Sequence, residues 1–395
     1  IGLSPMQTPM ASHVRAALRG SALVSIEAKL QIRCWSEQEF QASQAEWQGL
    51  LSSSNADPLF LSWAWMANWW ALWSRPSTDE LYLLAAYINN ELVGIAPCYI
   101  EKNHYIGKLL PVSRLHFIGH RQAKAGSLRS EYLGLIVKRE CEALVTGELV
   151  RALFSNPSWD KAILSDLITE HDFQRIIKCQ GGVDNARVRT LATSTCYAIN
   201  TAGSFEDYVH RLGKNTRLKL YGRRKSLVSH GEVELLTGNV VDVNTAMEQI
   251  DQFHQRRFDS ITFTNKRRAL VNRLLAEDSS IQCRSSLLQV NGETLSAMIN
   301  VEVAGRIYNL QLGYLEDFDR KVSLGTLHLG YAIEDAFNSP AVHTFDLLAG
   351  EGKNSDYKQR LAEPNANLES IMIIRNPVVK ALYSANDSLK VLLAR

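Results

Sequence analysis

The sequence lacks paired cysteines. Its six cysteines stand singly along 395 residues, and none belongs to a CxxC motif. Structural zinc sites and disulfide frameworks need closely spaced thiols, so we expect neither of them, and we predict no bound metal. Scattered single thiols are typical of a reducing compartment, and the sequence therefore favours a cytoplasmic protein.

Long apolar runs and a strong excess of one charge are also missing. No stretch approaches the roughly 20 apolar residues of a membrane-spanning helix. The net charge of +2 is too small to indicate a polyanion partner for the whole molecule. A chain of 395 residues exceeds one ordinary domain. We therefore predict an N-terminal extension (1–28), two domains (29–200 and 201–380) and a C-terminal tail (381–395).

A β-hairpin pattern occurs twice, about two hundred residues apart. In the first copy, apolar residues 81–88 and 92–100 flank Asn89-Asn90; in the second, strand-like residues flank Asn291-Gly292. Asn-Gly suits the type I′ turn of a tight hairpin. Each hairpin follows helical material and precedes another strand and a helix. The fold class is therefore predicted as α/β with mixed sheets: two copies of one unit, each a mostly antiparallel sheet flanked by helices.

Residues 308–337 form the most informative stretch of the second copy. An apolar, strand-like run is followed by a polar loop, then by Ser323-Leu-Gly-Thr326, where a helical pattern opens. A strand that ends in a glycine-containing loop and enters a helix presents free backbone N–H groups to an anion, most often a diphosphate. The alternative is an ordinary strand-loop-helix crossover.

The first copy has no such turn. Its strand-like residues 132–137 run through residues 138–140 into a helical pattern at 143–154, without a glycine turn or a hydroxyl side chain. If one half binds a nucleotide-like cofactor, we expect it to be the second.

Two helical stretches have unusual compositions. Residues 57–73 are rich in tryptophan, which indicates core packing or, alternatively, a wall of a substrate groove. Residues 214–225 contain six basic side chains, and no acid lies between Asp207 and Glu232. They form either a solvated face or a positive edge that holds an anionic substrate or cofactor phosphates. Interleaved aromatics are sparse, so a nucleic-acid partner is not favoured.

The order of these features resembles the GNAT superfamily of acyltransferases. It is most similar to the cellulose-biosynthesis-type acetyltransferase domain, in which two fused GNAT-like halves are related to the Fem aminoacyltransferases. The usual acyl-CoA loop of the superfamily, Arg/Gln-x-x-Gly-x-Gly/Ala, is kept only approximately in residues 320–326. The resemblance covers about residues 30–375 and rests on residues 60–73, 91–97, 130–136, 214–227, 253–258, 313–326 and 345–350 and on Tyr357-Lys358.

The resemblance implies transfer of an acyl group, such as acetyl, from acyl-CoA to an amine or hydroxyl. The acceptor would be a small molecule, a sugar or a cell-envelope precursor, as in polysaccharide biosynthesis. Such a reaction needs a diphosphate cradle, a donor to the thioester oxygen and a base. The cofactor residues implied are Leu312, Gly313, Arg320, Ser323, Leu324, Gly325 and Thr326. The candidate bases are Asp346, His254 and Glu302, the candidate acid is Tyr314, and the candidate acceptor-binding residues are Arg223, Arg224, Tyr357 and Lys358.

Two alternatives remain open. A Fem-like enzyme would take its acyl group from aminoacyl-tRNA and use the basic stretch to bind the tRNA, but no long heptad run predicts the coiled-coil arm that Fem proteins often have. A non-catalytic GNAT scaffold would bind a partner or a sugar.

Overall fold

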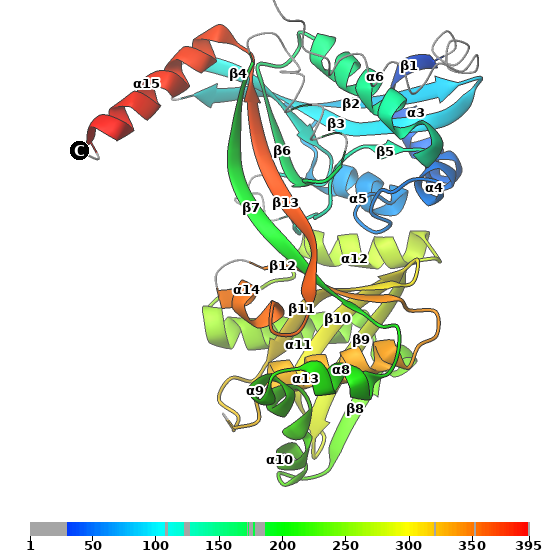
Figure 1. Ribbon diagram of the computed structural model, residues 1–395, viewed down its shortest axis with the longest axis vertical. Helices are drawn as coiled ribbons and strands as arrows, with labels where there is room; N and C mark the ends of the chain where they lie inside the picture. Colours follow the sequence, from blue (N-terminus) through cyan, green and yellow to red (C-terminus); the bar gives the residue numbers. More distant parts are fainter. Residues whose placement is uncertain are drawn as a thin grey trace, which may run out of the picture.

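The computed structural model describes residues 30–106, 110–121, 127–171, 173, 177, 186–319, 321–350 and 353–393. Within these residues, thirteen strands form one sheet that runs through two halves (Figure 1), in the order β1-β2-β3-β4-β6-β13-β7-β12-β11-β10-β9-β8, with β5 beside β3. The strands of the first half are β1 (Leu30–Trp35), β2 (Asp79–Ile88), β3 (Glu91–Ile106), β4 (Leu110–Phe117), β5 (Ile136–Val137), β6 (Lys161–Ile168) and β7 (Arg187–Asn200). Those that follow are β8 (Val233–Thr237), β9 (Gln282–Val290), β10 (Glu293–Val303), β11 (Arg306–Tyr314), β12 (Thr344–Gly350) and β13 (Glu363–Ile374).

The strand order contains one pattern twice. In the first half, β1 to β4 are antiparallel neighbours, and β4 then pairs in parallel with β6. In the second half, β8 to β11 are antiparallel neighbours, and β11 then pairs in parallel with β12. The predicted fold class, two mixed α/β units, is confirmed.

The hairpin turns explain why the repeat was visible in the sequence. Asn89 and Asn90 both have positive φ angles, 53° and 66°, and Asn291 and Gly292 have 49° and 79°. A type I′ turn requires positive φ at both central residues, which asparagine and glycine tolerate best. Both turns therefore lie where the sequence predicted them.

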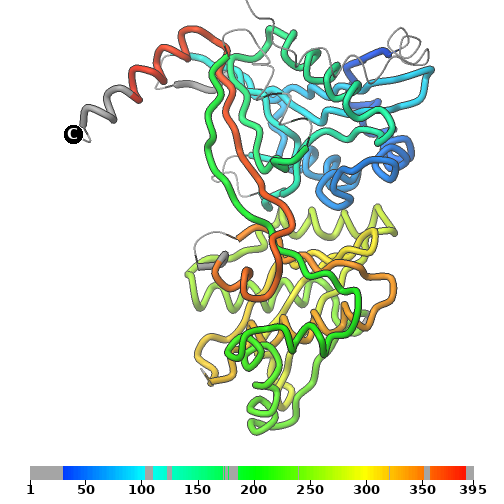
Figure 2. The backbone as a smooth tube through the Cα atoms, viewed as in Figure 1, coloured from blue at the N-terminus to red at the C-terminus, as the bar shows by residue number. Residues whose placement is uncertain are grey.

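The two halves exchange strands. β7 ends at Asn200, where a domain boundary was expected, yet it pairs with β12 of the second half. β13 comes from the end of the chain and pairs with both β6 and β7. The two long strands run side by side from one half to the other (Figure 2). The expected tail at 381–395 overlaps helix α15, where Lys161 of β6 donates a hydrogen bond to the hydroxyl of Tyr383. Side-chain alternation predicts a strand but not its partner, so this exchange was not foreseen. The expected extension 1–28 lies outside the described residues.

Helices cover the sheet and fill the junction between the halves. All five tryptophans of α5 are buried, and α5 packs against α12 of the second half. None of the helices that the structure describes is long and apolar enough to cross a membrane. The helices are α3 (Glu37–Ala42), α4 (Gln44–Ser52), α5 (Trp63–Trp73), α6 (Glu142–Ser155), α8 (Phe205–Arg211), α9 (Lys214–Arg217), α10 (Arg224–Val228), α11 (Val243–Phe258), α12 (Asn265–Glu277), α13 (Leu324–Phe337), α14 (Lys353–Lys358) and α15 (Pro377–Leu393).

Candidate functional site

β11 and β12 separate after only three paired residues. Arg306, Ile307 and Tyr308 of β11 pair with the start of β12, and beyond them the two strands line a cavity of about 750 Å³. β11 remains paired with β10 up to Tyr314, so its other edge is open toward the cavity. In an extended strand, every second residue points its N–H and C=O toward such an edge. The split therefore offers backbone donors and acceptors to a bound molecule.

The N-terminus of α13 lies at this cavity. Ser323 has a left-handed backbone (φ 57°, ψ 55°) and turns the chain into the helix at Leu324. A side chain at Gly325 would place its Cβ 2.8 Å from Cε1 of Tyr314, so any larger residue here would displace the Tyr314 ring. The amides of Gly325 and Thr326 donate no hydrogen bond to any described residue. Free amides at the positive end of a helix favour a bound anion.

The structure brings three of the four predicted cradle residues to the cavity: Ser323, Gly325 and Thr326 line it. Leu324 instead points into an apolar cluster beside Leu327. Arg320 lies outside the described residues.

Basic side chains surround the cavity. Arg129, Lys219, Arg257 and Lys358 all line it. Nη1 of Arg257 donates a 2.8 Å hydrogen bond to the hydroxyl of Tyr314, which also lines the cavity. The cavity is therefore suited to a ligand with negative charge.

The predicted acceptor residues Arg223 and Arg224 do not line the cavity. Nη1 of Arg224 lies 2.7 Å from Oε2 of Glu334 on α13, and its guanidinium stacks 3.9 Å from the ring centroid of Tyr331. The basic stretch contains a π-helical turn at Leu218–Gly222, which changes the direction of its side chains. Lys219 is the residue of this stretch that reaches the cavity.

His254 lines the cavity, but both of its ring nitrogens are occupied. Nε2 lies 3.2 Å from the carbonyl oxygen of Leu312, to which it donates, and Nδ1 accepts a hydrogen bond from the hydroxyl of Thr262. Burial lowers the pKa of His254, so the ring is neutral near pH 7. With no free lone pair, His254 is unsuited to the base role predicted for it.

Asp346, a predicted base, lies away from the cavity. Its side chain is fully buried and does not line the cavity. The carboxylate accepts hydrogen bonds from Nε of Arg306 at 3.0 Å, from the hydroxyl of Tyr132 at 2.9 Å and from the amide of Leu348 at 2.7 Å. These bonds occupy it, and it holds the two halves together rather than facing a substrate.

Two further predicted residues do not reach the cavity. A side chain at Gly313 would meet the backbone of Ile250 at 3.0 Å, so this glycine allows α11 to pack on β11. Glu302 forms an ion pair with Arg284 on the neighbouring strand β9 and does not line the cavity.

The end of β12 is fixed by Lys358. Its buried Nζ donates hydrogen bonds to the carbonyl oxygens of Leu347, Leu348 and Ala349, and burial lowers its pKa. Tyr357, which was predicted beside it as an acceptor residue, is partly exposed and lines the cavity. Both residues therefore lie at the site.

Sequence reasoning missed Glu131, which the first half contributes to the cavity wall. Its Oε2 accepts a 2.7 Å hydrogen bond from the amide of Ala349. Burial raises the pKa of the Glu131 carboxyl to about 7, although the nearby Arg129 opposes this shift. The one signal in the sequence is an acid inside the apolar run that follows Ser130; its distance from residue 349 along the chain hides the contact.

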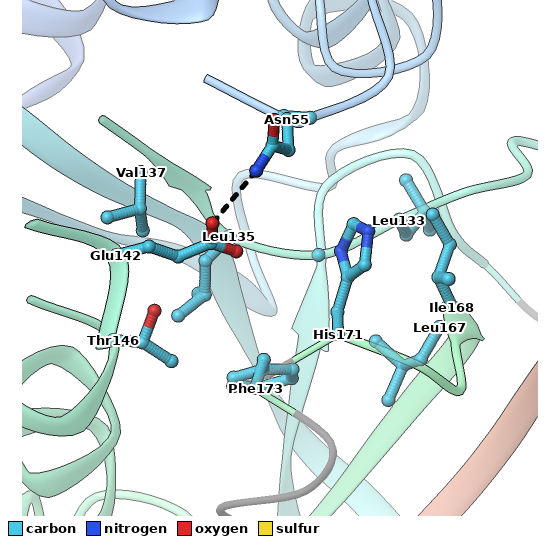
Figure 3. A pocket seen from close by; sticks show the side chains of 12 residues that line it. Asn55, Leu133, Leu135, Val137, Glu142, Thr146, Leu167, Ile168, His171 and Phe173 are labelled. Atoms are coloured by element: carbon cyan, nitrogen blue, oxygen red, sulfur yellow. Dashed lines mark hydrogen bonds between the residues drawn. The ribbon is translucent and has the colours of Figure 1, made fainter. Parts of the chain in front are cut away.

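The corresponding place in the first half is filled. Residues 133–137 insert where β6 leaves β4: Leu133 bridges Leu167, and Ile136 pairs with Ile95 of β3. Only about 20 Å³ of space remains between the end of β6 and the start of α6 (Figure 3), which is room for about one water molecule.

The helix start in the first half also has the wrong charge for an anion. Glu142 occupies the first turn of α6, and its carboxylate accepts a 2.9 Å hydrogen bond from Asn55 (Figure 3). A carboxylate at this end of a helix satisfies the helix dipole itself and repels a phosphate. An open split with free helix amides therefore exists in the second half and not in the described part of the first.

The second half of the chain is similar to a known domain family. Residues 214–359 match the family described as the acetyltransferase (GNAT) domain. A comparison with curated proteins finds no match. The structure of FemX is 10% identical, the likeness covers 89% of this chain and 99% of that one, and the TM-score is 0.58. A tandem GNAT protein from the clavulanic acid biosynthesis pathway is 11% identical, with 87% and 98% coverage and a TM-score of 0.44. The C-terminal domain of a putative lysylphosphatidylglycerol synthetase from Agrobacterium fabrum is 9% identical, with 90% and 96% coverage and a TM-score of 0.46.

Proposed function

Because the chain has the fused two-half fold of the GNAT superfamily, related to that of FemX, we propose that it is an acyltransferase that uses acyl-CoA. The acyl group, acetyl in the simplest case, passes to an amine or hydroxyl. The observation that carries the proposal is the split between β11 and β12, with the free amides of Gly325 and Thr326 at its edge.

The donor occupies the split. Its diphosphate lies against the N-terminus of α13, where backbone amides and the helix dipole favour negative charge. Lys219 and Arg257 add positive charge to the same cavity. The extended pantetheine arm follows the open edge of β11 and exchanges hydrogen bonds with its backbone. A cavity of about 750 Å³ is within the usual range for such ligands.

The thioester carbonyl lies near residues 312–314, where a backbone N–H of β11 stabilises the oxyanion. Tyr314 is the acid that protonates the leaving thiolate. Its hydroxyl oxygen accepts a hydrogen bond from Arg257, which leaves the hydroxyl proton free to be donated.

The acceptor enters beside Tyr357. This side chain is 38% exposed and lines the cavity, so it can contact a ligand from solvent. Trp65 and Leu128 of the first half form part of the same wall. Apolar and aromatic side chains with a few polar groups suit a sugar or another small molecule, in keeping with a polysaccharide or cell-envelope precursor.

A titration calorimetry experiment tests the proposal with acetyl-CoA, CoA and aminoacyl-tRNA as probes. We expect acetyl-CoA and CoA to bind with micromolar affinity, and the variant Gly325→Ala to lose at least about tenfold in affinity because the new methyl group displaces the ring of Tyr314. The matched control is Gly147→Ala in α6, where a Cβ meets nothing within 4 Å. Absence of CoA binding by the unaltered protein contradicts the proposal.

Aminoacyl-tRNA is the second candidate donor. Lys214, Lys219 and Lys225 are exposed, and Lys219 links this basic stretch to the cavity. Binding of aminoacyl-tRNA that weakens steeply with salt, without binding of CoA, would favour this donor. Binding of none of the three probes would favour a non-catalytic scaffold.

A further inference from the structure

We propose that Glu131, supplied by the first half, accepts the proton of the attacking group in the cavity of the second half. This inference rests on the proposed acyltransfer and names a further residue of the same site. It also gives the first half a role in the site although its own split is closed.

The carboxylate of Glu131 is held at one oxygen and available at the other. Oε2 accepts the amide of Ala349 at 2.7 Å and the thiol of Cys196 at 3.6 Å. Oε1 makes no hydrogen bond to a described residue; its near neighbour is Nε of Arg129 at 3.8 Å. An anchored side chain in the wall of a cavity, whose second oxygen has an ion pair at 3.8 Å but no hydrogen bond to a described residue, is positioned to take a proton from a ligand.

Hydrogen bonds of the two neighbouring residues, Ser130 and Tyr132, fix the position of Glu131. The hydroxyl of Ser130 accepts a 2.9 Å hydrogen bond from the indole of Trp65, and the hydroxyl of Tyr132 donates to Asp346 at 2.9 Å. The segment that closes the split of the first half therefore delivers Glu131 to the open split of the second half. Ala349, its anchor, lies at the end of β12 and faces the cavity across from β11.

Among the residues that the structure describes, no other carboxylate competes for the role. Glu131 is the only acidic side chain among the described residues that line the cavity. Asp346 is bound to Arg306 and Tyr132 away from the cavity, and both nitrogens of His254 are occupied.

The surroundings of Glu131 shift the pKa of its carboxyl toward a value that suits a base. Burial raises the pKa of its carboxyl to about 7, so the charged and neutral forms coexist near neutral pH. A base is most effective when its pKa lies near the working pH. Asp166 and Asp346 raise this pKa further, whereas Arg129 and the amide of Ala349 lower it. The charged or titratable groups that face Glu131 are Arg129, Asp166, Cys196, Asp346 and Lys358.

The lone pair of the acceptor nitrogen or oxygen forms a bond to the thioester carbon, and the proton of that atom moves to the carboxylate of Glu131. The carbon–sulfur bond then breaks, and the thiolate of CoA takes the hydroxyl proton of Tyr314. Release of the products returns a proton from Glu131 to solvent and restores the proton of Tyr314. The sum is acyl-CoA plus acceptor giving acylated acceptor plus CoA.

The test compares Glu131→Gln with a matched control, Glu302→Gln, which removes a carboxylate outside the cavity. Glutamine keeps an oxygen for the amide of Ala349 but cannot accept the proton. CoA release from acetyl-CoA is measured with glucosamine and with water as probe acceptors, between pH 5 and 9. CoA affinity is measured separately by calorimetry.

We expect Glu131→Gln to lower kcat about 100- to 1,000-fold, to keep the CoA affinity within about twofold, and to lose the rise in kcat/KM near pH 7. Glu131→Asp should recover part of the activity. Unchanged kcat, an intact pH profile or a rise in acceptor KM alone overturns the inference. If the protein binds acetyl-CoA but releases no CoA, the inference about Glu131 is overturned, whereas the proposed CoA-binding site is not contradicted. A protein that does not bind CoA contradicts the proposed function itself.

Discussion

The hydroxyl of Tyr132 donates a 2.9 Å hydrogen bond to the carboxylate of Asp346, across the junction between the two halves. The same carboxylate accepts hydrogen bonds from Arg306, and the hydroxyl of Tyr308 donates to Asp57 at 2.8 Å. All of these side chains except Arg306 are buried. This network joins β11 and β12 to the first half at the point where the split begins, next to Glu131. It therefore sets the shape of the cavity without facing it.

Replacing Asp346 should destabilise the protein. Asp346→Ala leaves the guanidinium of Arg306 without its closest partner, and loss of one member of a buried ion pair costs about 3–5 kcal/mol. Urea unfolding followed by circular dichroism measures the change. Tyr132→Phe removes a single hydrogen bond and should cost only about 1 kcal/mol. A stability of Asp346→Ala within about 0.5 kcal/mol of the unaltered protein would refute the structural role.

Positive charge near the N-terminus of α13 should strengthen the binding of CoA. Lys219→Ala removes an exposed cation that lines the cavity, and we expect CoA to bind about three- to tenfold more weakly, with a smaller dependence on salt. Lys225→Ala is the matched control, because this exposed lysine belongs to the same basic stretch but does not line the cavity. Equal losses in the two variants would show that only the general charge of the stretch matters.

The raised pKa of Glu131 predicts how stability depends on pH. Burial raises this pKa from 4.5 to about 7, so between these values the folded protein holds the proton more tightly than the unfolded chain. The resulting stability is fully present below pH 4.5 and is lost as the pH rises through 7. Glu131→Gln stays neutral and escapes this loss, which amounts to about 3 kcal/mol at most.

Thermal unfolding of Glu131→Gln and of the unaltered protein at pH 5 and pH 8 measures this effect. The variant should gain in relative melting temperature on going from pH 5 to pH 8. Glu302→Gln is the matched control, because it removes a carboxylate that lies outside the cavity and pairs with Arg284. A gain of the opposite sign would mean that Arg129 holds Glu131 charged in the folded state.

The filled split of the first half predicts one donor molecule per chain. Calorimetry should give a stoichiometry of one CoA, and Glu142→Gln, which removes the carboxylate at the start of α6, should leave both the stoichiometry and the affinity unchanged. A second CoA bound by the unaltered protein would show that residues 133–137 can leave the split.

Local chemistry made part of this structure predictable. Asn291-Gly292 and Asn89-Asn90 marked the hairpins because few residues tolerate positive φ, and Ser323, Gly325 and Thr326 marked the helix start at the cavity. Contacts between distant parts of the chain were not predictable. Asp346 was assigned to catalysis because an acid inside an apolar strand looks the same in the sequence whether it faces a substrate or pairs with a distant arginine such as Arg306.

The place of Glu131 in the cavity could not be predicted from the sequence either. Neither its neighbours in the sequence nor its spacing to residues 323–326 connects it to the cavity, because the contact depends on how the segment 131–137 crosses from one half to the other. The strand partners of β7 and β13 could not be predicted for the same reason, because they come from distant parts of the chain.

The pairing of β6 with β13 has a consequence for biosynthesis. As the nascent polypeptide leaves the ribosome, the sheet edge at β6 has no neighbour until residues 363–374 have been made. An early-folding first half, which ends at Asn200, would therefore wait with an exposed edge until β13 at Glu363–Ile374 has been synthesised. Severing the gene after codon 200 should yield two fragments that precipitate when expressed separately and recover solubility only when produced together.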